Sequence, residues 1–278
     1  MAENTTNPYA GNPLAGRDCL RLLDLSPEEA RLVLDTAAKQ KAEWKDGIYV
    51  RPYDGKAVAV ILEKPSMRTR NSFDVGITRL GAHSIIMSDD HSAFSRGETV
   101  KDTTLVLERF VDAIVIRTFA QSKVEEIAKW ASIPVVNALT DDYHPCQVLA
   151  DLLTIEEHLG KLSDLTMAYV GDGNNMANTY LEGGALTGMN VRVATPEGYE
   201  PDAKNLEECQ KVAATTGSEL TVMRDPIEAV TGADIIVTDT WTSMGEEEEH
   251  DRRLRDFQGF QVNSELMSHA KDSAIFMH

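Results

Sequence analysis

Short apolar runs alternate with helical stretches along most of this 278-residue chain, and this alternation restricts its fold more than any other feature. In the first half the apolar runs lie at 57–62, 84–87, 113–116 and 134–137, and the predicted helices between them span 69–80, 99–110 and 122–131. Strands separated by helices of this length form βαβ units, which build parallel sheets. The first half is therefore predicted to be one α/β unit.

Local signals place several of the helix ends. Ser26 to Glu29 is a capping box with proline in the first turn, so a helix is expected to begin there. Ser122 and Glu125 have the same spacing and are interpreted as a second capping box that opens the helix 122–131. Gly81 is predicted to close the helix 69–80.

The alternation restarts after a long helix predicted from Cys146 to His158. The later strands are expected at 165–170, 191–194, 219–223, 235–238 and 274–277. We therefore predict an α/β protein with two doubly wound parallel-sheet domains joined by a linking helix, 1–150 and 151–278. In such folds ligands bind at the carboxyl ends of the strands, so a site in the cleft between the two halves is the default expectation.

The charge of the chain excludes some classes of partner. It has 27 Lys and Arg against 45 Asp and Glu, a formal net charge of −18, which argues against nucleic acid and anionic membranes as partners. No stretch is long and apolar enough to span a bilayer, and residues 1–16 have no signal-peptide core. Three widely spaced cysteines indicate neither a disulfide framework nor a zinc site. We expect a soluble, cytoplasmic protein.

An anion pocket is predicted where the strand 57–62 passes into the next helix. Ser66 is placed to cap that helix, whose first N–H groups are unpaired, while Arg68, Thr69 and Arg70 add guanidinium and hydroxyl donors. Guanidinium groups bind phosphate through paired hydrogen bonds. The alternative is a solvated basic helix start on the surface. The coincidence of hydroxyls, arginines and a helix start at a strand end favours a phosphate site.

Two more segments of the first half carry polar groups at strand ends. Arg117 follows an apolar run, and a surface ion pair explains it as well as a ligand does. His144 and Gln147 lie three residues apart at the start of the linking helix, where both side chains can donate hydrogen bonds to one carbonyl oxygen of a ligand. Helix capping is the alternative role for His144.

The second half offers two such segments. Gly171 to Met176 resembles a dinucleotide-binding fingerprint, but Met176 occupies the third glycine position, so the amides of Asn174 and Asn175 are assigned to a small polar ligand instead. The loop Asp239 to Gly245 offers a carboxylate and a hydroxyl suited to an ammonium group. In the charged run after it, Glu248–Arg252 and Glu249–Arg253 have the spacing of helix-stabilising ion pairs, so a structural role is assigned to them.

Taken in order, these segments resemble the aspartate/ornithine carbamoyltransferase family. Ser66-Met67-Arg68-Thr69-Arg70 is similar to its Ser-x-Arg-Thr-Arg carbamoyl-phosphate motif, and His144-Pro145-Cys146-Gln147 to its His-Pro-x-Gln motif. Asp239 with Ser243-Met244-Gly245 resembles the amino-acid motif of the ornithine-using members. The resemblance implies two α/β domains, 1–150 for carbamoyl phosphate and 151–278 for ornithine, assembled as trimers or multiples of trimers.

The resemblance also implies a role for each matching residue. Ser66, Met67, Arg68, Thr69 and Arg70 would bind the phosphate, and Arg117, His144 and Gln147 the carbamoyl oxygen, with Arg68, Arg117 and His144 as the catalytic groups. Ornithine would be held by Asn175, Asp239, Ser243 and Met244. No metal or redox cofactor is implied, so catalysis would rest on positioning and on donors that stabilise charge on the carbonyl oxygen.

The sequence departs from the family pattern at two places. Ala93 stands near a position where ornithine enzymes often carry a glutamine that reaches the neighbouring subunit. Family members also continue beyond Phe276-Met277-His278 with Cys-Leu-Pro, an arginine-bearing loop and a last helix. We therefore expect the sequence to be incomplete at its C-terminus, and without those residues we expect weak catalysis and an exposed apolar patch on the first domain.

The expected function is transfer of the carbamoyl group of carbamoyl phosphate to the side-chain amine of L-ornithine, giving L-citrulline and phosphate. Two alternatives stay open. One is a non-catalytic homologue that binds carbamoyl phosphate or serves in assembly. The other is a carbamoyltransferase with another amine acceptor, putrescine or N-acetylornithine.

Overall fold

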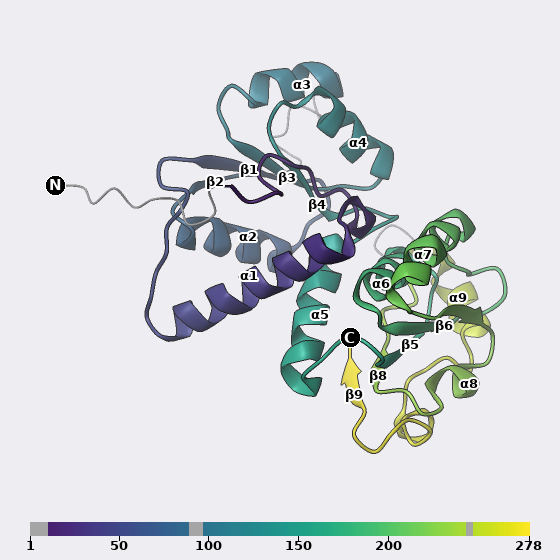
Figure 1. Ribbon diagram of the computed structural model, residues 1–278. Coiled ribbons are helices and arrows are strands. Elements are labelled where there is room, and N and C mark those ends of the chain that lie inside the picture. The colour runs from purple at the N-terminus through teal and green to yellow at the C-terminus, as the bar shows by residue number, and fades with distance from the viewer. Residues whose placement is uncertain (1–10, 89–96, 243–246) are drawn as a thin grey trace. The chain divides into compact units, whose positions relative to one another are not determined.

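The computed structural model describes residues 11–88, 97–242 and 247–278 and divides into two compact units, Met1–Cys146 and Gln147–His278 (Figure 1). Each unit is built on its own parallel sheet. The division falls within the first turn of helix α5, Pro145–Leu159, so this helix links the two units along the chain. The predicted class, two parallel-sheet α/β domains joined by a helix, is confirmed.

The first unit contains a sheet of four parallel strands in the order β2-β1-β3-β4. A short 3-10 helix η1 and helix α1 precede the sheet, and the later helices alternate with its strands. Along the chain the elements are η1 Leu22–Asp24, α1 Pro27–Lys45, β1 Ala57–Leu62, α2 Met67–Arg79, β2 His83–Ser88, α3 Val100–Leu107, β3 Ala113–Arg117, α4 Gln121–Trp130 and β4 Val135–Leu139.

Both faces of this sheet are buried, which explains why its strands are continuous apolar runs rather than alternating ones. In β1, Ala59 and Ile61 pack with side chains of α3 and α4, among them Val124 and Ile127. The alternate residues Val60 and Leu62 point to the other face and pack with Ile77 and Phe73 of α2. The helices therefore cover both faces, as a doubly wound sheet requires.

The structure confirms one predicted capping box and contradicts the other. Ser26 accepts a hydrogen bond from the Glu29 N–H while the Glu29 carboxylate accepts one from the Ser26 N–H, and α1 begins at Pro27. The second prediction is wrong, because α4 begins at Gln121 after the N-cap Ala120, which supplies no side-chain cap. Ser122 therefore lies inside the first turn of α4. A serine near a helix start does not by itself show whether it is the N-cap or a first-turn residue.

The second unit contains five parallel strands in the order β7-β6-β5-β8-β9. Helices again alternate with strands along most of its length. Its elements after α5 are β5 Thr166–Val170, α6 Asn175–Thr187, β6 Asn190–Ala194, α7 Ala203–Thr216, β7 Leu220–Met223, α8 Pro226–Val230, β8 Ile235–Val237, η4 Glu247–Glu249, α9 His250–Asp256, α10 Ser264–Met267 and β9 Ile275–Met277. Each strand lies within two residues of its predicted place.

Helices also enclose this second sheet. Nearly all of α6 is buried, which accounts for its apolar, small-residue sequence and its two adjacent glycines. On one face, Ala168 and Val170 of β5 and Ile236 of β8 share a core with Phe257 and Phe260 at the end of α9. The core fixes the ends of β5 and β8, and the loops that follow these two strands carry the predicted ornithine residues. In the described part of the chain no helix is long and apolar enough to cross a membrane.

Candidate functional site

The predicted phosphate cradle lies at the start of α2, directly after β1. Ser66 is the N-cap of the helix: its hydroxyl accepts a hydrogen bond from the Thr69 N–H at 3.2 Å and lies 3.0 Å from the Thr69 hydroxyl. The helix begins at Met67, two residues earlier than predicted. The first-turn N–H groups and the helix dipole together favour an anion at this point.

Arg117 lies beside this helix start, at the end of the neighbouring strand β3. Its Nη1 is 3.4 Å from the hydroxyl of Thr69, and both residues are buried, with 6% and 8% of their surface exposed. Its Nε has no hydrogen-bond partner among the described residues, and in that part of the chain the guanidinium makes no ion pair. Among the described residues, therefore, no surface ion pair accounts for Arg117. Buried cations are normally paired, so its charge and free N–H point to an anionic or carbonyl ligand.

Positive charge accumulates around Arg117. Burial lowers the pKa of Arg117, and the nearby guanidinium of Arg68 lowers it further. Burial also lowers the pKa of His144 to about 4, with a second contribution from Arg117. His144 is therefore a neutral imidazole at pH 7, which can donate a hydrogen bond to a ligand without carrying charge. The three residues come from α2, from β3 and from the segment just before α5, and Arg117 lies near each of the other two.

The remaining members of the motif are solvent-accessible. Arg68, Arg70 and Met67 are exposed, and 74% of the Met67 surface faces solvent. Ser66, Met67 and Arg70 line an open cavity together with Asp74 on the same helix. The exposed guanidinium of Arg68 lies close enough to Arg117 to lower its pKa, so positive charge extends from the surface to the buried group and favours an anion there.

Two charged side chains between β1 and α2 serve the structure of this edge. Lys64 is 5% exposed, forms an ion pair with Asp141 and lies 4.4 Å from the ring centroid of Phe119. The Glu63 carboxylate accepts hydrogen bonds from Thr118 and Lys123. These contacts join the residues after β1 to those after β3, so the strand ends that carry Arg117 and the helix start are held together.

Gln147 forms a hydrogen bond within its own helix. Its Nε2 donates to the Asp151 carboxylate one turn along α5, at 3.0 Å, and the hydroxyl of Tyr180 donates to the other Asp151 oxygen at 2.6 Å. Burial raises the pKa of Asp151, and the Asp239 carboxylate adds to that rise. The prediction that His144 and Gln147 bind one ligand oxygen together stays a prediction. Sequence reasoning missed Asp151 and Tyr180. For Asp151 the available signal was its position four residues after Gln147 on the same helix.

In the second unit the loop after β5 opens helix α6. Asn174 is the N-cap: its Oδ1 accepts from the Met176 N–H at 2.9 Å and from the Tyr169 hydroxyl at 3.3 Å. Its Nδ2 is buried and has no hydrogen-bond partner among the described residues, so this amide offers a donor to a ligand. Asn175 is the first residue of the helix and is half-buried.

The glycines of this loop have packing roles. A Cβ on Gly173 would lie 2.3 Å from the Pro201 nitrogen and 2.4 Å from the Tyr199 oxygen, so the backbone of residues 199–201 leaves no space for a side chain. The Gly173 N–H also donates to the Tyr199 carbonyl at 2.9 Å. Close backbone approach explains this glycine without a dinucleotide.

Asp239 lies two residues beyond β8 and is half-buried. The start of its loop is fixed by Thr238, whose hydroxyl donates to the Val170 carbonyl at the end of β5 at 2.7 Å. Trp241 stacks on Phe257 with ring centroids 5.6 Å apart. The other two predicted ornithine residues, Ser243 and Met244, lie outside the described residues.

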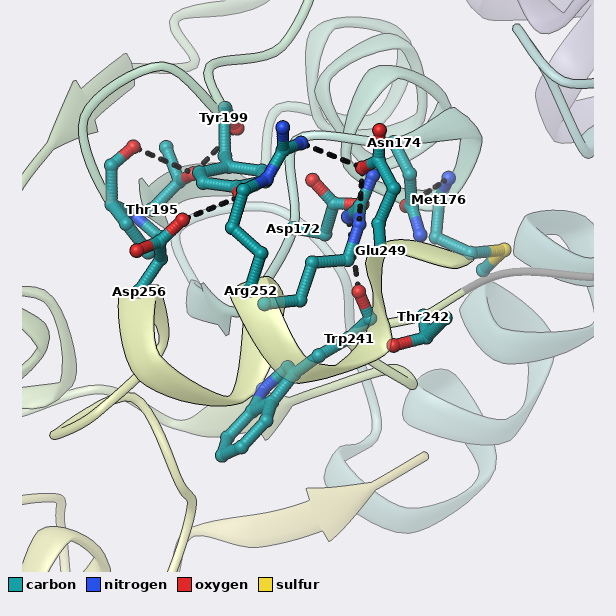
Figure 2. Close-up of polar contacts among 12 residues, drawn as sticks. Asp172, Asn174, Met176, Thr195, Tyr199, Trp241, Thr242, Glu249, Arg252 and Asp256 are labelled. Carbon is teal, nitrogen blue, oxygen red and sulfur yellow. Dashed lines mark hydrogen bonds and ion pairs between the residues drawn. The ribbon is translucent and has the colours of Figure 1, made fainter. Parts of the chain in front are cut away.

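An ion pair with Asp172 and a hydrogen bond to the Trp241 carbonyl join the two loops to α9 (Figure 2). The predicted pair Glu249–Arg253 is present at 3.2 Å, whereas Arg252 pairs with Glu249 at 2.7 Å rather than with the predicted Glu248. Arg253 also forms a buried ion pair with Asp172, which sequence reasoning missed. The available signal was Phe257, which follows Arg253 by four residues and therefore marks the same helix face as buried.

The described residues contain no group of three or more His, Cys, Asp or Glu side chains placed to hold a metal ion. What they offer is two sets of polar groups. The first unit presents a buried arginine, a neutral imidazole and a helix N-terminus, suited to an anion with a carbonyl group. The second presents carboxylate and amide groups, suited to an amino acid.

Two family models match nearly the whole chain. Residues 17–157 match the carbamoyl-P binding domain of aspartate/ornithine carbamoyltransferase, and residues 163–278 match the Asp/Orn binding domain. Among curated proteins, the ornithine carbamoyltransferase of Carboxydothermus hydrogenoformans is 50% identical over 95% of this chain and 85% of its own length. The ornithine carbamoyltransferase of Clavibacter sepedonicus is 52% identical over 94% of this chain and 85% of its own.

Solved structures give the same result. The ornithine carbamoyltransferase from Pyrococcus furiosus is 46% identical with a TM-score of 0.92, over 95% of this chain and 85% of that one. The anabolic ornithine carbamoyltransferase from Campylobacter jejuni is 36% identical with a TM-score of 0.88, over 94% and 84%.

Proposed function

We propose that this chain, which belongs to the aspartate/ornithine carbamoyltransferase family, transfers the carbamoyl group of carbamoyl phosphate to the side-chain amine of L-ornithine. The products are L-citrulline and phosphate. The relatives named above are ornithine carbamoyltransferases at 36–52% identity over almost the full chain, which supports ornithine as the acceptor.

The single observation that carries the proposal is the environment of Arg117. Its guanidinium is buried, lies next to the Thr69 hydroxyl, is repelled by Arg68 and has no partner for Nε in the described part of the chain. An anion or a polarised carbonyl oxygen that binds it stabilises its charge. We assign the phosphate to Ser66, Met67, Arg68, Thr69 and Arg70. We assign the carbamoyl oxygen to Arg117, His144 and Gln147.

The chemistry needs these donors at a definite step. The amine nitrogen attacks the carbonyl carbon, a C–N bond forms, and negative charge develops on the carbonyl oxygen. The C–O bond to phosphate then breaks, phosphate leaves with the bonding electrons, and the nitrogen loses a proton. Donors fixed at the oxygen stabilise the developing charge, and each is typically worth about 2.7–4 kcal/mol. His144 suits this role as a neutral donor, because protonation would place a second cation beside Arg117.

The amine must be neutral when it attacks. A lysine-like amine has a reference pKa of about 10.4, so its binding site has to favour the uncharged form or remove a proton on binding. We assign the amino-acid part of ornithine to Asn175, Asp239, Ser243 and Met244. The half-buried Asp239 carboxylate and the buried Asn174 amide beside Asn175 support a polar amino-acid site in the second unit.

A citrulline assay tests the proposal. With carbamoyl phosphate saturating, we expect colorimetric citrulline formation with ornithine and none of the corresponding products with putrescine or N-acetylornithine. Carbamoyl phosphate that raises the melting temperature without any product would instead support a non-catalytic binding homologue. An Arg117→Gln variant serves as the control, because it should lose both the product and the shift.

We further propose that the chain acts in arginine metabolism in the cytoplasm and assembles as a homotrimer or a multiple of trimers. Large exposed apolar side chains on the first unit support a subunit contact there: Val106 and Phe110 are 59% and 71% exposed. Native mass spectrometry tests the assembly, and a purely monomeric species would contradict it.

A further inference from the structure

We propose that Arg253 is a positioning residue for the amino-acid substrate: its guanidinium fixes the loop that carries Asp239 against the loop that carries Asn175. This inference rests on the proposed function, because it assigns a role to the residues around the ornithine site. Arg253 is not itself placed as a ligand. It belongs to α9, which begins eleven residues after Asp239 in the sequence.

Arg253 contacts three segments at once, through Asp172, Trp241 and Tyr199, which Figure 2 labels. Its Nη1 donates to the Asp172 carboxylate at 2.6 Å and to the Trp241 carbonyl at 3.0 Å. Its Nε donates to Glu249 at 3.2 Å, and its Cζ lies 5.1 Å from the centroid of the Tyr199 ring. Carboxylate, main-chain carbonyl and aromatic face together hold the guanidinium in one orientation.

The two loops bound in this way carry the proposed substrate groups. Asp172 lies three residues before Asn175, in the turn between β5 and α6. Trp241 lies two residues after Asp239, in the loop after β8. Because β5 and β8 are hydrogen-bonded neighbours, their loops emerge side by side at one edge of the sheet. One guanidinium bonded to both loops therefore fixes the separation of Asn175 and Asp239.

Arginine suits this task better than lysine does. Its planar guanidinium has five N–H donors in a rigid arrangement, whereas the lysine ammonium is a single point of charge on a flexible stem. The Arg253 side chain is 8% exposed and that of Asp172 is 9% exposed, so little water weakens the pair. A lysine would keep the charge but would not span Asp172 and the Trp241 carbonyl with the same geometry.

Kinetics of Arg253→Lys test the role. We expect KM for ornithine to rise about tenfold or more, since a small misplacement of positioning groups has large kinetic effects, while KM for carbamoyl phosphate stays within about twofold. Arg252→Lys is the matched control, because Arg252 is the exposed neighbour and pairs with the same Glu249. It should leave both constants unchanged. A lower melting temperature with both constants unchanged would show a purely structural role and overturn the proposal, as would an equal rise in both.

A readout independent of turnover keeps the test separate from the proposed function. In a Trp44→Phe, Trp130→Phe background, Trp241 is the one remaining tryptophan of the sequence, and its quenching by acrylamide reports how its loop is held. We expect Arg253→Lys to increase quenching and Arg252→Lys to leave it unchanged. Unaltered quenching in Arg253→Lys would refute the positioning role even if the parent protein forms no citrulline.

A second variant covers the case in which Arg253→Lys does not fold. Asp172→Asn keeps the shape of the side chain and removes the charge that Arg253 binds. We expect it to raise KM for ornithine selectively and to increase Trp241 quenching in the same way. Wild-type values of both would contradict the proposal.

Discussion

The buried neutral imidazole of His144 predicts a specific loss of stability in mild acid. Burial, and secondarily Arg117, lowers its pKa from 6.5 to about 4 in the folded protein. Between these values the unfolded chain binds a proton that the folded chain does not, so the free energy of unfolding decreases as the pH falls from 6.5 towards 4. Between pH 7 and pH 5 this single group accounts for a loss of about 2 kcal/mol.

The comparison of His144→Gln with the parent isolates this contribution. The other titrating groups are the same in both proteins. Between pH 7 and pH 5 the free energy of unfolding of the variant should therefore fall by about 2 kcal/mol less than that of the parent. A Trp241→Phe background leaves Trp44 and Trp130, both in the first unit, as reporters of urea unfolding. The control variant is His83→Gln, because His83 is exposed and lies in the same unit. Its free energy of unfolding should fall between pH 7 and pH 5 by as much as that of the parent.

The result that would refute this reasoning is an equal loss of stability in the parent and in His144→Gln. It would mean that His144 titrates alike in the folded and unfolded states and is not buried beside a cation. The assignment of a neutral donor at the carbamoyl oxygen would then fail. In the parent protein, titration of His144 should likewise cause no change in kcat for citrulline formation between pH 6 and 8.

Three further changes have calculable effects. Arg117→Gln should lower kcat for citrulline formation by about 10²–10³-fold, while circular dichroism shows that the fold is retained. If the variant weakens substrate binding more than it lowers kcat, Arg117 does not stabilise the transition state. Tyr180→Phe removes the 2.6 Å hydrogen bond to the buried Asp151 and should lower the free energy of unfolding by about 1.5–3 kcal/mol in urea titrations; no change would mean that this hydroxyl is solvated. Ser66→Ala removes the cap on the Thr69 N–H and should cost about 1 kcal/mol while raising KM for carbamoyl phosphate, whereas Ser66→Thr should restore both.

The strands and the order of the motifs were predictable because they depend on local patterns. Both faces of β1 and β3 are buried, so their apolar runs are unbroken, and the turns and helix starts that follow mark where each strand ends. Arg68, Arg117 and His144 were predicted to meet because they follow strands or begin helices at one edge of a parallel sheet. In the structure Arg68 lowers the pKa of Arg117 and Arg117 lowers that of His144, so both residues lie near Arg117.

What the sequence did not reveal depends on contacts between distant segments. The spacing of Glu249 and Arg253 predicts a solvated helix pair. Phe257 on the same helix face is a sequence signal for burial, but the partner Asp172 is known only from the tertiary packing of this face, where Phe257 stacks on Trp241. In the same way, Ser122 has the residue type and spacing of a cap, but the chain enters α4 one residue before it. Local sequence patterns identify the residues that can form a cap or an ion pair, and tertiary contacts determine which of them do so.

Gly173 shows how a missing side chain can shape the proposed ornithine site indirectly. Since the main chain of residues 199–201 passes where its Cβ would be, any larger residue would force two backbone segments apart. Tyr199 belongs to that segment and forms the aromatic surface beneath Arg253. An alanine at position 173 would therefore displace Tyr199 and, through it, Arg253, which the added methyl group does not touch. A survey of tolerated substitutions should find this glycine as intolerant of change as the residues assigned to ornithine.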